Sequence, residues 1–373
     1  MSSEFSQKIF FYCSPPAPPE KGAYSHSIVC LADGLKSLDV KFYSNIDFWQ
    51  ISPEKDEYLF NHDPTVTPND CSIVILDCDW FVENSLFPDK LFHSGRNYVT
   101  VYFERSADAI NLPKNAWQPE FRQFDFIFRT HYNQRFKYPA NVYPWAFGLS
   151  HRILLETEDL PDFSEKKRNL LVNFRLSHPL RKTIQEEFLP LIQNILVIDN
   201  TIDNFDASLA SPYHYLQWVQ TGMRHYQNYY KRLKDSAACA CFGGLLINAW
   251  PSDSFGPTKL WDRILNKTLN ILDPRPKRLM NWDSFRFWES LAAGCLTFHL
   301  DLERYGALLP VMPDNWRHYI GINLDNMWET VDRVASDPDI LARIAIEGRQ
   351  WALEHYSPVP TALRFLKTVE LKR

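Results

Sequence analysis

Apolar and polar positions divide the first half of the chain into short buried runs and longer amphipathic ones. Continuous apolar runs are typical of strands buried on both faces, and apolar residues along one side of residues 25–36 indicate a helix. The strand–helix–strand opening is a βαβ unit. Strands are predicted at residues 8–13, 40–43, 72–76, 98–103 and 124–128. The pattern therefore predicts a parallel sheet with covering helices that ends near Trp145.

A polar stretch at residues 150–167 separates this pattern from a second one of the same kind, and we interpret it as a linker. Residues 245–280 fit no simple unit and are interpreted as an insertion. Strands are predicted at 169–174, 194–198, 236–242 and 296–300, and helices at 181–193, 213–233, 325–336, 338–355 and 359–370. Two such halves predict an α/β fold with a cleft between them, at the C-terminal ends of the strands.

The composition is that of a globular protein with a surplus of aromatic residues. The 373 residues are 45% hydrophobic and 23% charged, which suits two domains. Aromatic residues make up 15%; most are expected in the core, but such a surplus also favours sites for sugars or other flat ligands. The net charge is −5 and no Lys/Arg block stands out, so no nucleic-acid partner is expected.

Targeting signals and cysteine usage indicate the cellular compartment of the protein. No run has the length and apolarity of a transmembrane segment, and the first residues lack the basic-then-apolar pattern of a signal peptide. The seven cysteines contain no Cys-x-x-Cys pair and indicate buried thiols in a reducing compartment. We therefore expect a cytoplasmic protein with no metal site and no tightly bound cofactor.

Residues 284–295 carry the clearest candidate chemistry. They predict a short helix that Asp283 or Ser284 can cap and that Gly294 ends in the left-handed conformation. Arg286 and Glu289 stand three apart and are neighbours on one helix face. A helix N-terminus beside an arginine is a phosphate site. The alternative is an ordinary core helix followed by an ordinary strand.

Other phosphate-binding devices are scarce in this sequence. It contains no Gly-x-Gly-x-x-Gly and no Walker-type P-loop, so a dinucleotide-binding Rossmann domain is disfavoured. Two candidate phosphate-binding features remain: the Gly243–Gly244 turn after a predicted strand, and the helix start at Ser284.

Three segments together resemble a known family. Residues 229–243, 284–295 and 337–357 look like the donor half of GT-B glycosyltransferases, closest to the exostosin-like pattern. The resemblance implies two Rossmann-like domains facing across a cleft. It implies an N-terminal acceptor domain (1–155), a C-terminal nucleotide-sugar donor domain (165–355) and a last helix (356–373) that crosses back to the first domain. The implied activity transfers a sugar from a nucleotide-diphosphate sugar to a hydroxyl of a glycan or small-molecule acceptor, without a metal.

The resemblance also implies roles for single residues. Glu289 would hold the ribose hydroxyls of the donor, and Ser284 and Arg286 would contact its diphosphate or sugar. Further donor-site residues would be Arg175, Arg181, Lys182, Gly243, Gly244 and Gly294. The sequence departs from many GT-B enzymes at Asn281, where they carry a first glutamate eight positions before the second, so retaining or inverting stereochemistry stays open.

A base is needed if the reaction inverts the anomeric centre. Glu104, directly after a predicted strand of the first half, is the first candidate, and His26 and His131 are the next. Each could equally be a structural residue.

Two other interpretations remain open. Asp77-Cys-Asp79 follows a predicted strand and resembles the metal-binding motif of GT-A glycosyltransferases, which would make the enzyme metal-dependent. Alternatively, the chain is a non-catalytic nucleotide- or glycan-binding protein on the same scaffold. The sequence specifies neither the sugar and base of the donor, nor the acceptor, nor the oligomeric state.

Overall fold

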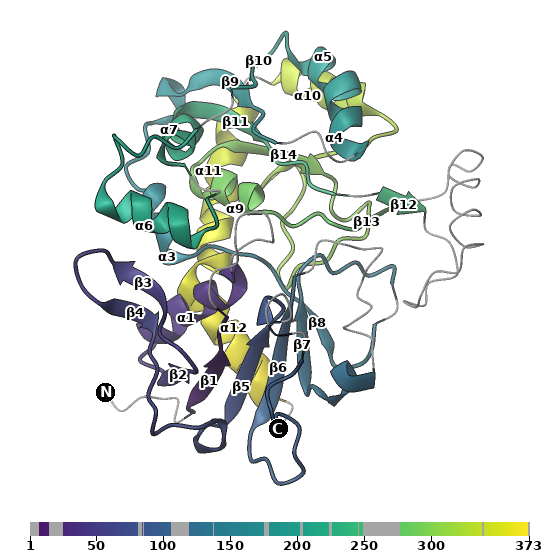
Figure 1. Cartoon of the computed structure of the whole chain (residues 1–373). Coiled ribbons are helices and arrows are strands. Elements are labelled where there is room, and N and C mark those ends of the chain that lie inside the picture. The colour runs from purple at the N-terminus through teal and green to yellow at the C-terminus, as the bar shows by residue number, and fades with distance from the viewer. Residues whose placement is uncertain are drawn as a thin grey trace.

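Two parallel sheets organise the chain. The computed structural model describes residues 7–14, 25–80, 84, 86–105, 119–136, 138–174, 179–201, 204–223, 226–244, 246–248, 277–337 and 339–371. One sheet has six strands and the other five, and within each sheet all neighbouring strands run parallel. We call the parts around them the N-terminal and C-terminal lobes; they lie at the bottom and the top of Figure 1.

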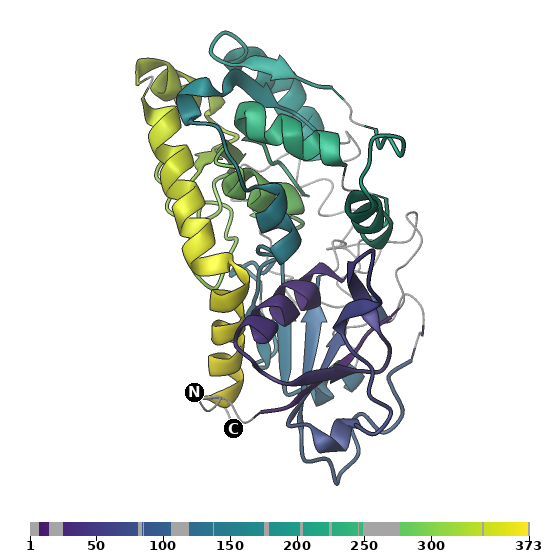
Figure 2. The same cartoon turned by 90° about the vertical axis from the view of Figure 1, so that its left-hand side faces the viewer.

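The N-terminal lobe is built on the six-stranded sheet in the order β2-β1-β5-β6-β7-β8. Its strands are β1 (Ile9–Tyr12), β2 (Phe42–Ser44), β5 (Ile73–Asp77), β6 (Val99–Glu104), β7 (Phe126–Arg129) and β8 (Val142–Pro144). Helix α1 (His26–Ser37) covers one face and packs beside the last helix, α12 (Pro358–Glu370), as Figure 2 shows. Apolar residues of α12, including Phe365 and Leu366, belong to the same buried cluster as Ile9 and Phe103.

The C-terminal lobe is built on the five-stranded sheet in the order β10-β9-β11-β14-β15. Its strands are β9 (Lys167–Leu171), β10 (Val197–Asp199), β11 (Ser236–Ala240), β14 (Leu296–Leu300) and β15 (Ile320–Ile322). Its helices are α4 (Pro179–Thr183), α5 (Leu189–Ile192), α6 (Pro212–Gln220), α7 (Gln227–Asp235), α9 (Phe285–Ala292), α10 (Met327–Ser336) and α11 (Ile340–Tyr356). A hairpin of β12 (Leu246–Asn248) and β13 (Lys277–Leu279) extends from this lobe.

Several connections tie the lobes together. Helix α3 (His151–Glu156) lies in the segment that runs from β8 to β9, and α11 passes directly into α12. The side-chain amide of Asn133 donates to the carbonyls of Leu279 at 2.9 Å and Tyr305 at 2.8 Å. A second hairpin, β3 (Phe48–Ser52) with β4 (Glu57–Phe60), reaches α6, where Gln50 and Gln220 exchange two hydrogen bonds of 2.6 and 3.0 Å.

The fold class predicted from the sequence is confirmed, and the structure differs from the local predictions in three places. The predicted helix 213–233 is two helices, because Gly222 and Met223 take left-handed backbone conformations between α6 and α7. The predicted linker contains α3, whose N-cap Ser150 accepts a hydrogen bond from Ile153. The β3–β4 hairpin was not predicted. None of the described helices is long and apolar enough to span a membrane.

Candidate functional site

The first turn of α9 presents unused hydrogen-bonding groups where the two lobes meet. Ser284 is the N-cap residue in an extended conformation, but its side chain caps nothing. Its hydroxyl oxygen is buried and has no hydrogen-bond partner among the described residues. Arg286 is partly exposed, and within the same described part of the chain its guanidinium makes no hydrogen bond or ion pair. A hydroxyl, a guanidinium and a helix N-terminus are thus collected at one point.

The glycine turn that follows β11 packs against the segment that leads into α9. Gly244 has a φ of +48°, and a Cβ atom there would lie 2.2 Å from the carbonyl oxygen of Asn281. A Cβ on Gly243 would lie 2.7 Å from the same oxygen. Only glycine lets the turn approach the segment that leads into α9 so closely. Both glycines therefore support the helix start at the carboxyl ends of the C-terminal strands.

Asp283 fixes the same helix start from the side of the N-terminal lobe. Its carboxylate accepts hydrogen bonds from the backbone N–H of Phe147 at 2.7 Å and from the indole of Trp288 at 2.6 Å. Its own N–H donates to Nδ1 of His131 at 3.0 Å. Burial raises the pKa of Asp283 to about 7. The site is thus completed by backbone and side-chain groups from both lobes.

Glu289 lies one turn further along α9 and is buried in a polar network. Its two oxygens accept hydrogen bonds from the hydroxyls of Tyr229 at 3.1 Å and Tyr230 at 2.5 Å. Arg152 of α3 lies 3.9 Å from the same carboxylate and donates to the Tyr230 hydroxyl at 2.8 Å. Arg286 shares the helix face predicted from the sequence but forms no ion pair with Glu289. Ribose binding by Glu289 stays a prediction, and it requires a tyrosine hydroxyl to leave the carboxylate.

The remaining predicted donor residues lie at different distances from the start of α9. Arg181 donates from Nε to the carbonyl of Phe242 at 3.0 Å, directly beside the glycine turn. Lys182 is exposed and pairs with Glu186 at 3.7 Å on the helix surface. Gly294 has a φ of +62° and ends α9 at the helix end opposite Ser284, as a helix-capping glycine does, and its donor contact stays a prediction. Arg175 lies outside the described residues.

The carboxyl edge of the N-terminal sheet carries a buried charge cluster, and Glu104 belongs to it. Its carboxylate lies 3.8 Å from Nη1 of Arg129, on the neighbouring strand, and both side chains are almost fully buried. The prediction that Glu104 acts as a base is untested by this arrangement. The Glu104 carboxylate lies at the carboxyl edge of the sheet, as predicted for the base, but it lies close to the positive charge of Arg129.

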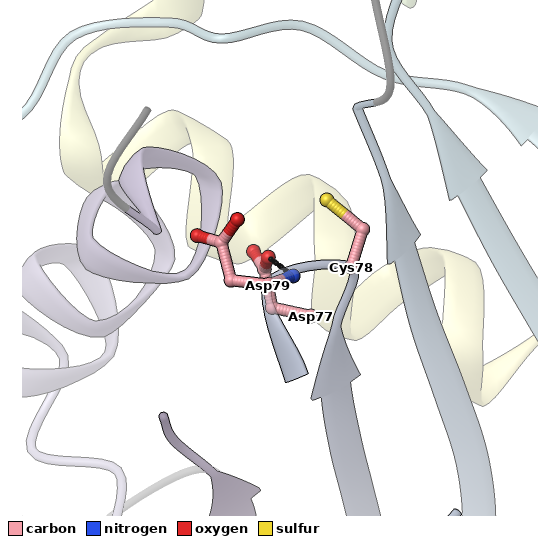
Figure 3. A group of neighbouring side chains, drawn as sticks. All are labelled: Asp77, Cys78 and Asp79. Atoms are coloured by element: carbon pink, nitrogen blue, oxygen red, sulfur yellow. Dashed lines mark hydrogen bonds between the residues drawn. The ribbon is translucent and has the colours of Figure 1, made fainter. Parts of the chain in front are cut away.

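Asp77 and Asp79 belong to the same cluster, and Figure 3 shows them with Cys78 at the end of β5. Their ligand atoms lie within 4.8 Å of one another, close enough to share a cation. That cation is already present: Arg105 is hydrogen-bonded to Asp79 and lies 3.7 Å from Asp77. Burial, followed by the neighbouring Asp79, raises the pKa of Asp77 to about 7, although Arg105 opposes the shift. The motif is an ion-paired strand end.

The two candidate histidines are buried and hydrogen-bonded. Nδ1 of His131 accepts the Asp283 N–H, so the proton of the neutral ring is on Nε2. Burial, with Arg129 and Arg105 nearby, lowers the pKa of His131 well below its usual value. These contacts argue against His131 as the base. His26 starts α1, and its Nε2 lies 3.2 Å from the carbonyl of Gly148, while its ring contacts Phe285 edge-on.

Sequence reasoning missed the residues that hold the site together. Asp283 was considered only as a helix cap, and Arg152, Tyr230 and Asn133 were given no role. Apart from local contacts such as that of Trp288 with Asp283, their partners lie 59 to 172 residues away along the chain, so no local spacing signals them. Arg152 even falls in the segment that we interpreted as a linker.

Comparison with known proteins shows the fold but no family. No protein-family model matches the chain, and no curated protein does. Among solved structures, an alpha-glucosyltransferase in complex with UDP-glucose and DNA containing an abasic site is similar over 98% of this chain and 99% of that one, with a TM-score of 0.55 and 11% identity. The same kind of enzyme with UDP alone gives 0.52, at 98% and 100% coverage and 10% identity. The chain has the GT-B fold.

This fold excludes the GT-A architecture, whereas the metal dependence suggested by Asp77 and Asp79 stays untested. A GT-A glycosyltransferase would carry its donor motif on a different architecture, so the comparison of Asp77-Cys-Asp79 with that family is wrong. The GT-B fold agrees with the family resemblance in its architecture. At 10–11% identity it does not transfer an activity, a substrate or the exostosin-like assignment.

Proposed function

We propose that the protein is a glycosyltransferase that binds a nucleotide-diphosphate sugar at the start of α9. The observation that carries the proposal is the conjunction of three groups: the Ser284 hydroxyl, which has no hydrogen-bond partner among the described residues, the Arg286 guanidinium and the helix N-terminus. Two diphosphate oxygens suit a guanidinium fork and backbone N–H groups. Arg181, beside the glycine turn, adds a second cation within the same strand-end region.

The same groups serve the reaction as well as binding. An acceptor hydroxyl attacks the anomeric carbon, and the bond from that carbon to the diphosphate oxygen breaks. The nucleoside diphosphate leaves with an additional negative charge, which Arg286 and the α9 N-terminus stabilise. The acceptor proton passes to a base on the N-terminal lobe if the configuration inverts, and Glu104 is our candidate.

Direct measurement of nucleotide binding tests the proposal. Isothermal titration with UDP, GDP and ADP compares the wild type with Arg286→Ala and Ser284→Ala. Losing one charge-assisted contact costs about 1.5–3 kcal/mol, so Arg286→Ala is expected to weaken the preferred nucleotide by roughly ten- to a hundredfold. Lys167→Ala is the matched control, because this exposed lysine pairs with Asp235 on the surface, at the end of β9 away from the site, and its loss leaves affinity unchanged.

The outcomes separate the proposal from its main rival. Equal nucleotide affinity in Arg286→Ala and the wild type refutes the site. A non-catalytic nucleotide-binding protein would show the same affinity loss but would never release nucleoside diphosphate from any nucleotide sugar in the presence of a broad acceptor panel. Metal independence, a cytoplasmic location and the lack of a nucleic-acid partner stay part of the proposal; two of the solved glucosyltransferase structures contain DNA.

A further inference from the structure

A cavity that is separate from the α9 start lies between the lobes, beside the β3–β4 hairpin. Its volume is about 400 Å³, within the range of small-molecule sites. Its walls come from α1 and the β3–β4 hairpin of the N-terminal lobe, from α6 of the C-terminal lobe, and from α3 between them. Figure 2 shows these elements on the face of the molecule that carries α1. A ligand in this cavity would touch both lobes at once.

Gln217 of α6 gives this cavity an unmet hydrogen bond. The residue lines the cavity, its side chain is 5% exposed, and its Oε1 atom is buried without a hydrogen-bond partner among the described residues. A buried amide oxygen left unpaired is unfavourable, and such groups in native proteins are rare. A ligand hydroxyl can donate to the oxygen of the amide or accept from its nitrogen, so it satisfies this group in either orientation.

The other walls offer flat apolar faces and further polar groups. Trp49 and Tyr213 line the cavity, and Trp49 has a φ of +62°, a strained conformation of the kind that gathers at ligand sites. Asp33 contributes a carboxylate, of which one oxygen accepts the His151 N–H at 2.7 Å. Burial raises the pKa of Asp33 to about 7.

We infer that this cavity binds a neutral sugar of one or two rings. Sugar hydroxyls match Gln217 and Asp33, and the apolar faces of a pyranose suit the rings of Trp49 and Tyr213. A simple anion fits less well, because Lys36 in these walls pairs with Glu57 at 3.8 Å and Arg152 lies 3.9 Å from Glu289, so both cations already have carboxylate partners. The volume exceeds that of a single ring and is too small for a long oligosaccharide.

The cavity is also connected to the candidate donor site. Arg152 lines the cavity and contacts both Glu289 and Tyr230. A sugar that binds against Arg152 would therefore alter the network around Glu289. This coupling, unlike the sugar site itself, rests on the proposed function, and it makes Arg152 a positioning residue. Coupling of binding is reciprocal, so a bound sugar and a bound nucleotide would change each other's affinity by the same factor.

Titration of the full chain with defined sugars tests the inference. Glucose, N-acetylglucosamine and cellobiose are the probes, with putrescine and glutarate as charged controls, and binding is followed by isothermal titration and thermal shift. Gln217→Leu removes the amide and is expected to weaken sugar binding at least about tenfold, the effect of one lost hydrogen bond. Gln185→Leu, at an exposed position, is the matched control and binds sugar like the wild type.

A second measurement on Gln217→Leu keeps the result interpretable. Because the leucine removes an unpaired polar atom, the ligand-free variant is expected to be at least as stable as the wild type. Loss of sugar binding with unchanged UDP affinity supports a separate sugar site. The inference is overturned if no probe sugar binds the wild type, if only the charged controls bind, or if Gln217→Leu retains full sugar affinity. Failure of the proposed function would instead appear as absent nucleotide binding with sugar binding intact.

Discussion

Asp283 should make the stability of the protein depend on pH in a defined direction. The residue is almost fully buried, accepts hydrogen bonds from Phe147 and Trp288, and has a pKa raised to about 7. In the unfolded chain it titrates near its usual value of 3.8. Between these two values the folded protein binds a proton that the unfolded chain does not. The contribution is therefore fully present below 3.8 and is lost as the pH rises through about 7.

The magnitude follows from the size of the shift. About three pKa units at 1.36 kcal/mol each give roughly 4 kcal/mol in total, of which about 2 kcal/mol falls between pH 5 and 7. Asp283→Asn cannot titrate and keeps one of the two acceptors. The new amide NH₂ group would point at one of the two buried N–H donors. The variant is therefore expected to be about 1–3 kcal/mol less stable than the wild type even above pH 7, where the aspartate is ionised.

The assay is urea denaturation of the wild type and Asp283→Asn at about pH 5, 6, 7 and 8. The quantity of interest is the difference in unfolding free energy between the two proteins, because it cancels the titration of other buried groups such as His131. We expect this difference to shrink as the pH rises to about 7 and then to stay constant. The exposed Asp332→Asn is the control. A difference that is independent of pH, or that grows with pH, refutes the reasoning.

Three further predictions concern the turn, the hairpin and metal dependence. Gly244→Ala should lose more than about 2 kcal/mol of stability in denaturant, because its φ is +48° and a backbone carbonyl lies 2.2 Å from the added Cβ; Gly95→Ala, with its nearest atom at 3.6 Å, should be neutral. Gln220→Leu removes both hydrogen bonds to Gln50 and should speed hydrogen exchange in the β3–β4 hairpin. Sugar transfer should survive EDTA, because Arg105 already neutralises the strand-end carboxylates; loss of activity that Mn²⁺ restores would contradict this.

Elements whose pattern is set locally were predictable from the sequence. The buried runs at β5, β6 and β14 are continuous apolar segments, and each forms a strand within two residues of its predicted bounds. The predicted helix 213–233 failed for a different reason. Its apolar spacing continues past Gly222, and tertiary packing decides that the chain turns there. The short β3–β4 hairpin lies outside the sheets and is held partly by Gln220, 170 residues away from Gln50.

The candidate site was predictable only where one segment supplies the chemistry. Ser284 and Arg286 share a helix start, so their proximity could be predicted from spacing alone. The partners of Glu289 could not be read in this way, because its carboxylate meets Tyr230 and Arg152 from two distant elements. Spacing placed Arg286 and Glu289 on one helix face. In the described part of the chain the Arg286 guanidinium forms no ion pair with Glu289 or with any other residue, so it is able to bind an anion.

The hydrogen bonds between the start of α9 and the N-terminal lobe limit how the two lobes can move against each other. The α9 start depends on the N–H of Phe147 and the ring of His131, both contributed by the segment that ends the N-terminal sheet. A rotation of one lobe against the other must either carry this segment with α9 or break two buried hydrogen bonds. Because unmade buried hydrogen bonds are costly, the first course is favoured. Residues 131–133 and 145–149 are then expected to move with the C-terminal lobe, and bending is expected where they join β7 and β8 rather than in the polar stretch 150–167.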